Sequence, residues 1–170
     1  MKHFLLISAL WFVLNSVTSA QENYALSFDG TDDYVACPAL NPSSFTLEAW
    51  VNPDGVANDQ AIISTLNPFM ATGAELHIKS GQVYATIWNG SALTFQDIAS
   101  TSAVSAGNWF HVACTYTTGG LFVLYINGIP EASATIPLYT QGLQQLILGR
   151  RSGLAAYFFD GSMDEVIAWN

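Results

Sequence analysis

The sequence has few basic residues and few charged residues of either sign. Four Lys and Arg residues stand against 13 Asp and Glu residues among 170, and charged residues make up 10% of the chain. Such an acidic surface repels phosphate backbones, so we expect no nucleic-acid partner. Half of the chain is apolar (51%), which excludes disorder and indicates one compact domain with a sizeable core.

Long apolar runs are missing except near the start. Lys2 and His3 precede an apolar stretch over residues 4–14, which only Ser8 interrupts, and small residues follow up to Ala20. This pattern predicts a signal peptide over residues 1–20 and a secreted or cell-surface domain over residues 21–170, with no membrane span after cleavage. An uncleaved membrane anchor is the alternative, which the short run disfavours. Without the leader the net charge is 3 − 13 = −10.

Cysteine is also scarce. Cys37 and Cys114 are the two in the chain, too few for a disulfide framework. In an oxidising compartment they can form one disulfide bond, and two buried free thiols are the equal alternative. Their separation in sequence does not give the Cα distance that a bridge requires, so both interpretations stay open.

Helical periodicity is absent beyond the leader, and alternation of apolar and polar residues predicts strands instead. The strand-like runs cover residues 24–28, 34–37, 45–51, 61–65, 75–79, 83–88, 109–117, 121–126, 146–148 and 163–169. Asn127-Gly128 predicts a tight hairpin, because both central positions of a type I′ turn need positive φ. About a dozen short strands at this spacing predict an all-β sandwich or barrel of antiparallel sheet.

The motifs form an ordered series that resembles laminin-G-like jelly-roll domains. The matching segments are residues 25–30 (ALSFDG), 32–35 (DDYV), 45–51, 109–116 (WFHVACTY), 124–128 (LYING), 148–150 (LGR) and 159–170. The resemblance spans nearly all of residues 21–170. It implies a two-sheet antiparallel jelly-roll sandwich related to concanavalin A-like lectins, glucanases and pentraxins.

The sequence departs from that family in two respects. Members usually continue past the last strand, whereas this chain stops at Asn170, so we expect it to be a fragment or one module of a larger exported protein. Pentraxin-like members carry a disulfide at positions that correspond to Glu48 and Ala113. Neither cysteine falls there, so that bridge does not carry over.

The resemblance also implies a structural Ca²⁺ ion where the first and last strands meet. The matching ligands are Asp29 and Asp164. Calcium takes six to eight oxygen ligands, which carboxylates, backbone carbonyls and waters can supply. The alternative is that Asp29 belongs to an ordinary Asp-Gly turn and Asp164 merely marks a strand end.

Aromatic residues near strand ends are the candidates for glycan binding, since sugar rings stack on aromatic faces and amides bind hydroxyls. Trp88 precedes Asn89 at a loop edge, and Tyr84 falls on the same strand face as Trp88. The loop aromatics are further candidates, namely Phe69, Tyr139 and Tyr157. By contrast, the remaining tryptophans of the mature chain are expected to pack inside the sandwich, namely Trp50, Trp109 and Trp169.

A catalytic carboxylate pair is not evident. Retaining glycosidases need two carboxylates about 5 Å apart, yet Glu48 is alone on its strand, and the adjacent Asp164 and Glu165 should face opposite sides. His111 has no nucleophile nearby in sequence. We therefore expect no enzyme but an exported recognition module for carbohydrate or an extracellular-matrix or cell-surface ligand. The alternatives are an adhesion module that binds protein and an ancillary domain of a larger secreted glycoside hydrolase.

Overall fold

The computed structural model describes residues 24–40, 42–88, 95–137, 139 and 144–170. Within these ranges the chain forms 12 strands and no helix, so no described helix is available to cross a bilayer. The predicted signal peptide lies outside the described residues and stays a prediction. The strands are β1 (Leu26–Asp29), β2 (Val35–Ala39), β3 (Phe45–Pro53), β4 (Gln60–Ser64), β5 (Ala74–Lys79), β6 (Gln82–Trp88), β7 (Phe95–Ala103), β8 (Phe110–Tyr116), β9 (Leu121–Ile126), β10 (Ile129–Thr135), β11 (Gln145–Leu148) and β12 (Asp160–Trp169).

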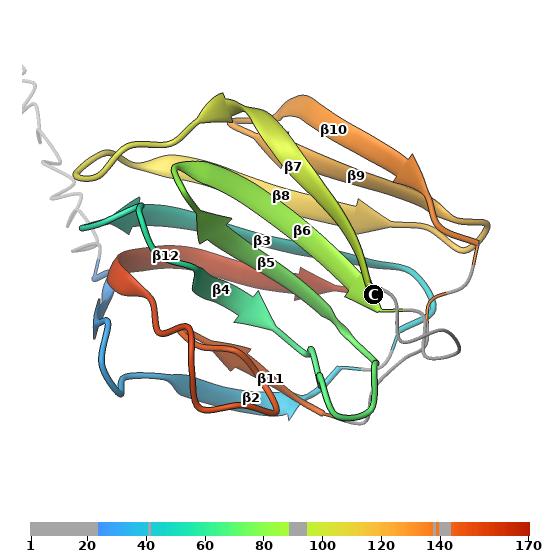
Figure 1. Ribbon diagram of the computed structural model, residues 1–170, viewed down its shortest axis with the longest axis horizontal. Coiled ribbons are helices and arrows are strands. Elements are labelled where there is room, and N and C mark those ends of the chain that lie inside the picture. Colours follow the sequence, from blue (N-terminus) through green and yellow to red (C-terminus); the bar gives the residue numbers. More distant parts are fainter. Residues whose placement is uncertain (1–23, 41, 89–94, 138, 140–143) are drawn as a thin grey trace, which may run out of the picture.

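The strands form two six-stranded antiparallel sheets that pack face to face (Figure 1). Sheet A has the order β1-β12-β3-β8-β9-β10, and sheet B has the order β2-β11-β4-β5-β6-β7. Figure 1 shows sheet B in front and sheet A behind it. Strands distant in sequence are neighbours, as β1 and β12 are. The predicted two-sheet jelly-roll sandwich is confirmed.

Alternation along the strands builds the core between the sheets. In β3, Phe45, Leu47, Ala49 and Val51 are buried while the residues between them face outward. In sheet B, β5 and β6 send every second residue inward in the same way. Burying one large apolar side chain contributes about 1.5–3 kcal/mol, so strands with this pattern have one strongly preferred orientation.

The hairpin between β9 and β10 has the predicted turn. Asn127 and Gly128 adopt φ values of 51° and 76°, as a type I′ turn requires. The Asn127 side-chain oxygen also accepts a hydrogen bond from the backbone N–H of His111 at 2.9 Å. The turn is therefore tied to the neighbouring strand β8.

Two strands, β7 and β10, were not predicted, and each lies at the outer edge of a sheet. Both contain many small or polar residues, and β10 includes Pro130, which an edge strand tolerates because one of its sides needs no hydrogen bonds. Glu131 of β10 joins the two edges. Its carboxylate accepts hydrogen bonds from the backbone and hydroxyl groups of Thr101 and Ser102 on β7.

The two cysteines are free thiols in the structure. Cys37 lies on β2 of sheet B, and Cys114 lies on β8 of sheet A. Burial raises the pKa of the Cys114 thiol to about 12, so this side chain behaves as a small apolar core residue. Of the two alternatives left open by the sequence, the structure has the free thiols.

The expectation that three tryptophans pack inside the sandwich is wrong. Trp50, Trp109 and Trp169 are 37%, 43% and 56% exposed, and they lie on the outer side of sheet A or at its margin. In β3 the inward positions are taken by Phe45, Leu47, Ala49 and Val51, so Trp50 must face outward. The outer face of sheet A is therefore unusually aromatic.

The expectation that Asp164 and Glu165 face opposite sides is also wrong, because β12 contains a β-bulge. Its register against β3 passes from Asp164 opposite Trp50 to Ile167 opposite Glu48, which places one extra residue on β12. Glu165 has a φ of 47°, a left-handed conformation that costs a non-glycine residue energy. Asp164 and Glu165 consequently line the same outer groove.

Candidate functional site

The outer face of sheet B carries a hollow lined by polar and aromatic side chains. It extends along the outer face of β5, β6 and β7 and has a volume of about 150 Å³. Strand alternation explains its composition, since the neighbours of the inward core residues on these strands must face outward. The lining side chains are Asp59, Leu66, Pro68, His77, Lys79, Thr86, Trp88, Phe95, Asp97 and Arg151.

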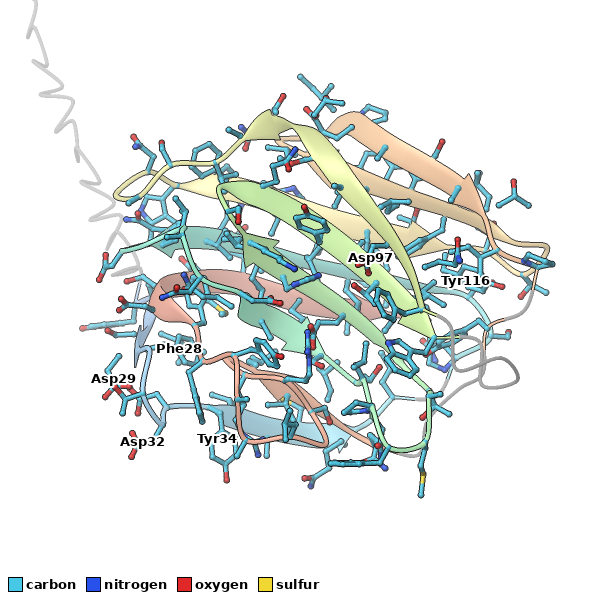
Figure 2. The ribbon with its side chains drawn as sticks, viewed as in Figure 1. Phe28, Asp29, Asp32, Tyr34, Asp97 and Tyr116 are labelled. Atoms are coloured by element: carbon cyan, nitrogen blue, oxygen red, sulfur yellow. The ribbon has the colours of Figure 1, made fainter. Side chains whose placement is uncertain are left out.

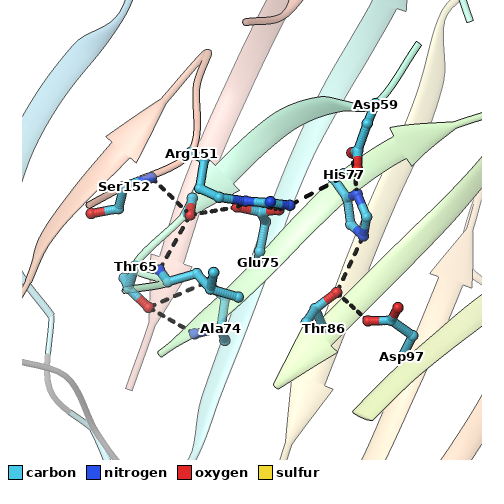
Figure 3. Close-up of polar contacts among 11 residues, drawn as sticks. Asp59, Thr65, Ala74, Glu75, His77, Thr86, Asp97, Arg151 and Ser152 are labelled. Atoms are coloured by element: carbon cyan, nitrogen blue, oxygen red, sulfur yellow. Dashed lines mark hydrogen bonds and ion pairs between the residues drawn. The ribbon is translucent and has the colours of Figure 1, made fainter. Parts of the chain in front are cut away.

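An ion pair between Arg151 and Glu75 lies at one side of the hollow (Figure 3). Arg151 donates from Nε to Glu75 Oε2 at 3.0 Å and from Nη2 to Oε1 at 2.5 Å. Ser64 donates a further hydrogen bond to Glu75 at 2.7 Å. Glu75 is fully buried, so the fork-like pairing is what makes its charge tolerable there.

A chain of hydrogen bonds runs through His77 across the floor of the hollow (Figure 3). Nδ1 of His77 lies 2.7 Å from Asp59 Oδ1, and Nε2 lies 3.2 Å from the Thr86 hydroxyl. That hydroxyl donates to Asp97 at 2.6 Å, and it has only one proton. The Thr86 hydroxyl therefore uses its proton on Asp97 and can only accept from Nε2 of His77. Asp59, His77, Thr86 and Asp97 are joined in one hydrogen-bonded row.

The charged groups in the hollow stabilise one another in their ionised forms. Burial raises the pKa of Asp59, but the hydrogen bond and charge of His77, with the charge of Arg151, outweigh it and lower the pKa overall. Burial also lowers the pKa of Arg151, and the hydrogen bond and charge of Glu75 more than offset this. Asp59 and Arg151 are therefore held in their charged forms, and Arg151 is held on Glu75 rather than left free for a ligand.

Two stacked aromatic side chains lie beside these hydrogen-bonded residues. Trp88, at the end of β6, stacks on Phe95, at the start of β7, with ring centroids 5.6 Å apart and planes 27° apart. Phe95 is 51% exposed. The hollow is smaller than a typical small-molecule pocket, so it suits the edge of a ring that rests on the surface. Apolar ring faces next to carboxylate and ammonium groups form an arrangement that suits a hydroxyl-rich ring.

The structure brings together part of the predicted ligand site. Trp88 lines the hollow, and Tyr84 lies on the same outer face with its ring 5.2 Å from the ring of His77. Asn89 lies outside the described residues. Of the loop aromatics, Phe69 is exposed, whereas Tyr139 packs on Phe45 and Tyr116 against the core.

Several polar residues of the hollow were not predicted from the sequence. Glu75, His77 and Lys79 alternate along β5, a pattern that indicates three polar side chains on one face. Asp97 lies on the unpredicted edge strand β7, opposite Thr86. The alternation on β5 was the available signal, but the partners Asp59 and Arg151 come from segments distant in sequence.

The two predicted calcium ligands are not brought together. Asp29 pairs with Asp160 across β1 and β12, whereas Asp164 lies four residues farther along β12 and pairs with Trp50. At about 3.3 Å per residue this separates the two positions by roughly 13 Å along the strand. The strand register, which the sequence alone does not give, separates them.

Asp29 has other acidic neighbours in the turn that follows β1. Single ligand oxygens of Asp29, Asp32 and Asp33 lie within 4.8 Å of one another, and all three residues are exposed. Figure 2 shows Asp29 and Asp32 at this margin of the sandwich. Backbone N–H groups, that of Thr31 first, lower the pKa of Asp29. Three carboxylates are oxygen donors of the kind that Ca²⁺ prefers, so this turn fits the ion better than a pair formed with Asp164.

The fold defines a class of protein, the two-sheet antiparallel jelly-roll domains. The sequence profile described as "Concanavalin A-like lectin/glucanases superfamily", Laminin_G_3, matches residues 29–170. The chain belongs to this family. A comparison with curated protein sequences gives no match.

Solved structures of three proteins show the range of similar domains. The carbohydrate-binding module (CBM40) of the Ruminococcus gnavus IT-sialidase, bound to α2,3-sialyllactose, is 16% identical with a TM-score of 0.64, over 88% of this chain and 90% of that one. Mouse laminin α1 domains LG4-5 give 13% identity and a TM-score of 0.67, over 85% of this chain and 41% of that one. A Bacteroides ovatus protein proposed to bind carbohydrate gives 22% identity and a TM-score of 0.63, over 85% of this chain and 42% of that one. These identities establish the fold alone, and this chain spans about two fifths of the last two proteins.

Proposed function

We propose that this domain is an exported, non-catalytic carbohydrate-recognition module whose ligand rests on the hollow of sheet B. The observation that carries the proposal is the stacked pair Trp88 and Phe95 beside a floor of paired charged groups. The aromatic pair offers an apolar surface to the C–H face of a sugar ring. Similar domains that bind glycan, such as the Ruminococcus gnavus module, add support.

Polar groups at the rim can bind the hydroxyls of such a ring. Asp97 uses Oδ1 to accept from Thr86, and a carboxylate has further lone pairs for a ligand hydroxyl. The ammonium group of Lys79 is a donor on the other side of the hollow. The hydrogen bonds among Asp59, His77 and Thr86 hold the floor in one arrangement, which reduces the ordering cost of binding.

The pairing of Arg151 favours neutral over acidic sugars. An acidic sugar needs a free guanidinium or several free donors for its carboxylate. Arg151 is already engaged in a two-point contact with Glu75 and lies over the ring of Tyr157 at 3.9 Å. We therefore propose neutral hexoses, with their hydroxyl groups, as the preferred ligand class.

A glycan array followed by calorimetric titration of the best ligand tests this function. Trp88→Ala should weaken binding at least tenfold, which corresponds to about 1.4 kcal/mol. The matched control is Trp169→Ala, which removes an exposed indole from the other sheet and should leave the affinity unchanged. Binding that depends on Trp169 and not on Trp88 would place the ligand elsewhere, and silence on all glycans would favour a protein ligand and an adhesion role.

The carboxylates of the hollow support recognition rather than hydrolysis. Glu75 is buried against Arg151, and Asp59 and Asp97 are each hydrogen-bonded within the floor. A retaining glycosidase instead needs one carboxylate free to attack and one to carry a proton. Prolonged incubation with the bound glycan should yield no cleaved product, and release of a reducing end would overturn the non-catalytic assignment.

Calcium binding stays a proposal, and we propose the turn after β1 for it, where three carboxylates lie close together. Asp29, Asp32 and Asp33 would hold the ion with backbone carbonyls and waters. A melting curve recorded with calcium and then with a chelator tests this, since a bound ion raises the midpoint. An unchanged midpoint would remove calcium from the proposal.

A further inference from the structure

The outer face of sheet A carries a second groove, on the opposite side of the sandwich from the hollow. Trp50, Trp109, Asp164 and Glu165 line it, and its volume is about 380 Å³, which is within the range of small-molecule pockets. The two indoles are 37% and 43% exposed. Large exposed aromatic surfaces on a folded domain indicate contact with a ligand or partner.

The strand register assembles this groove from three strands. Trp50, near the middle of β3, lies opposite Asp164 on one side and opposite His111 of β8 on the other. Trp109 directly precedes β8. The indole of Trp50 and the ring of His111 are in edge contact, with centroids 5.5 Å apart. The groove therefore rests on paired central strands and not on a loose loop.

The β-bulge in β12 is what places two carboxylates in the groove. The extra residue, Glu165, has a φ of 47°, and its N–H donates to Asp164 Oδ1 at 2.8 Å. Beyond the bulge the alternation of β12 changes phase, so that Val166 and Ala168 pack on the core while Ile167 faces outward. Bulges of this kind commonly redirect side chains beside binding sites.

Among the described residues, no Lys or Arg side chain is paired with the acidic groups of the groove. In the part of the chain that the structure describes, the Lys and Arg residues are Lys79, Arg150 and Arg151. Lys79 and Arg151 line the hollow of sheet B, and the guanidinium of Arg150 lies 4.1 Å from the ring centroid of Tyr34. The groove thus presents uncompensated negative charge beside two electron-rich indole faces.

We propose that this groove binds a positively charged organic group, an ammonium carried on an alkyl or sugar scaffold. An ammonium group is attracted to the face of an indole within about 6 Å, most strongly to tryptophan, and the carboxylates add Coulomb attraction. A neutral apolar ligand would leave the carboxylates unpaired, and a bare metal ion would make no use of the indoles. This site lies on a different sheet from the proposed glycan site, so the test of one does not decide the other.

Choline and its neutral isostere 3,3-dimethylbutan-1-ol provide the direct test, because they differ in the charge at one atom. Calorimetric titration of the whole chain at low ionic strength should show choline binding at least tenfold more tightly than the alcohol. The affinity should fall as salt is added. Equal affinities for choline and the alcohol would overturn the proposal. So would a heat of titration with choline no larger than that with sodium chloride at the same ionic strength.

Three variants place the site and separate it from the glycan site. Glu165→Gln keeps the size of the side chain and should weaken choline binding at least threefold. Trp109→Ala should weaken it at least tenfold, while Trp88→Ala should leave it unchanged. The location is refuted if Trp88→Ala weakens choline binding, or if neither Glu165→Gln nor Trp109→Ala weakens it. Comparing glucosamine with N-acetylglucosamine, and Nα-acetyl-lysine amide with its ε-acetylated form, tells a sugar ammonium from a peptide one.

Discussion

The outer faces of the two sheets share one antiparallel frame and differ in how their charges are compensated. On sheet B, buried Glu75 is paired with Arg151, and Asp59 is paired with His77. On sheet A, Asp164 and Glu165 line a groove with tryptophans, and no described Lys or Arg side chain lines it. The first face is organised before any ligand arrives, whereas the second keeps negative charge available.

This difference follows from the scarcity of basic residues. With four Lys and Arg residues in 170, the position of each one decides which acidic groups are neutralised. Lys79 and Arg151 lie at the hollow, so that face is suited to hydroxyl groups and the other is suited to a cation. The contrast gives four predictions, in order of decreasing effect.

Removing the charge of Glu75 should cause the largest loss of stability. Glu75→Gln removes the two-point carboxylate partner of Arg151, whose side chain is 16% exposed and keeps only the 4.0 Å contact with Asp59. Breaking a buried ion pair costs about 3–5 kcal/mol. Urea unfolding at pH 7 measures the change in the free energy of unfolding. The control is Glu165→Gln on the other face, expected within about 0.5 kcal/mol of the native chain. Similar losses of unfolding free energy in both variants would show that the two faces do not differ in how their charges are compensated.

Thr86→Val should have the next largest effect. The exchange keeps the shape of the side chain but removes the hydroxyl between His77 and Asp97, and an unsatisfied buried polar group costs about 1–3 kcal/mol. Thr115→Val on sheet A is the matched control, since no side-chain hydrogen bond of Thr115 is seen among the described residues. Thermal unfolding should separate the two variants, and equal midpoints would show that the hydroxyl chain does not stabilise sheet B.

Glu131 should give a smaller effect that depends on pH, because it is only half-buried at the edge of its sheet. The hydroxyl of Thr101, followed by the groups of Ser102, lowers the pKa of Glu131 from its usual 4.5 to about 2. Its stabilising contribution is therefore complete above pH 4.5 and is lost as the pH falls through about 2. Melting curves should show a gap between the native chain and Glu131→Gln that closes over this interval. A gap that stays constant down to pH 2 would contradict the contact between the sheet edges.

The smallest effect is expected from Glu165→Asn. Asparagine adopts the left-handed conformation more readily than glutamate, so the variant should be more stable by less than about 1 kcal/mol. Choline binding should nevertheless weaken, because the carboxylate is gone. Glu165→Gln keeps the strain and is the control for the gain in stability. A loss of stability in Glu165→Asn would show that the bulge is not strained at this residue.

Much of the fold was predictable because central strands bury one face. Their apolar residues alternate strictly, as in β3 and β6, and their turns carry Asn-Gly or Ser-Gly pairs. The edge strands β7 and β10 escaped prediction because an edge position needs fewer apolar residues and tolerates proline and small polar residues. The same lack of signal concealed Asp97, which lies on β7.

The candidate site was predictable only in part for a related reason. Trp88 and Tyr84 share a strand face, which period-two alternation gives directly. The pairing of Glu75 with Arg151 joins residues 76 positions apart, and no local pattern indicates it. The bulge at Glu165 overturned the prediction that Asp164 and Glu165 face opposite sides, since one inserted residue changes which side chains face outward on the rest of β12.

The sequence by itself determined the antiparallel all-β class, the shortage of basic residues and the type I′ turn at Asn127-Gly128, because these depend on composition, alternation and local backbone preference. Only the tertiary structure decided that Trp50, Trp109 and Trp169 face outward, that Asp29 lies far from Asp164, and which carboxylates have a cation beside them. Those outcomes depend on strand register and on contacts between segments distant in sequence. A shift of one residue, as at Glu165, is enough to change them.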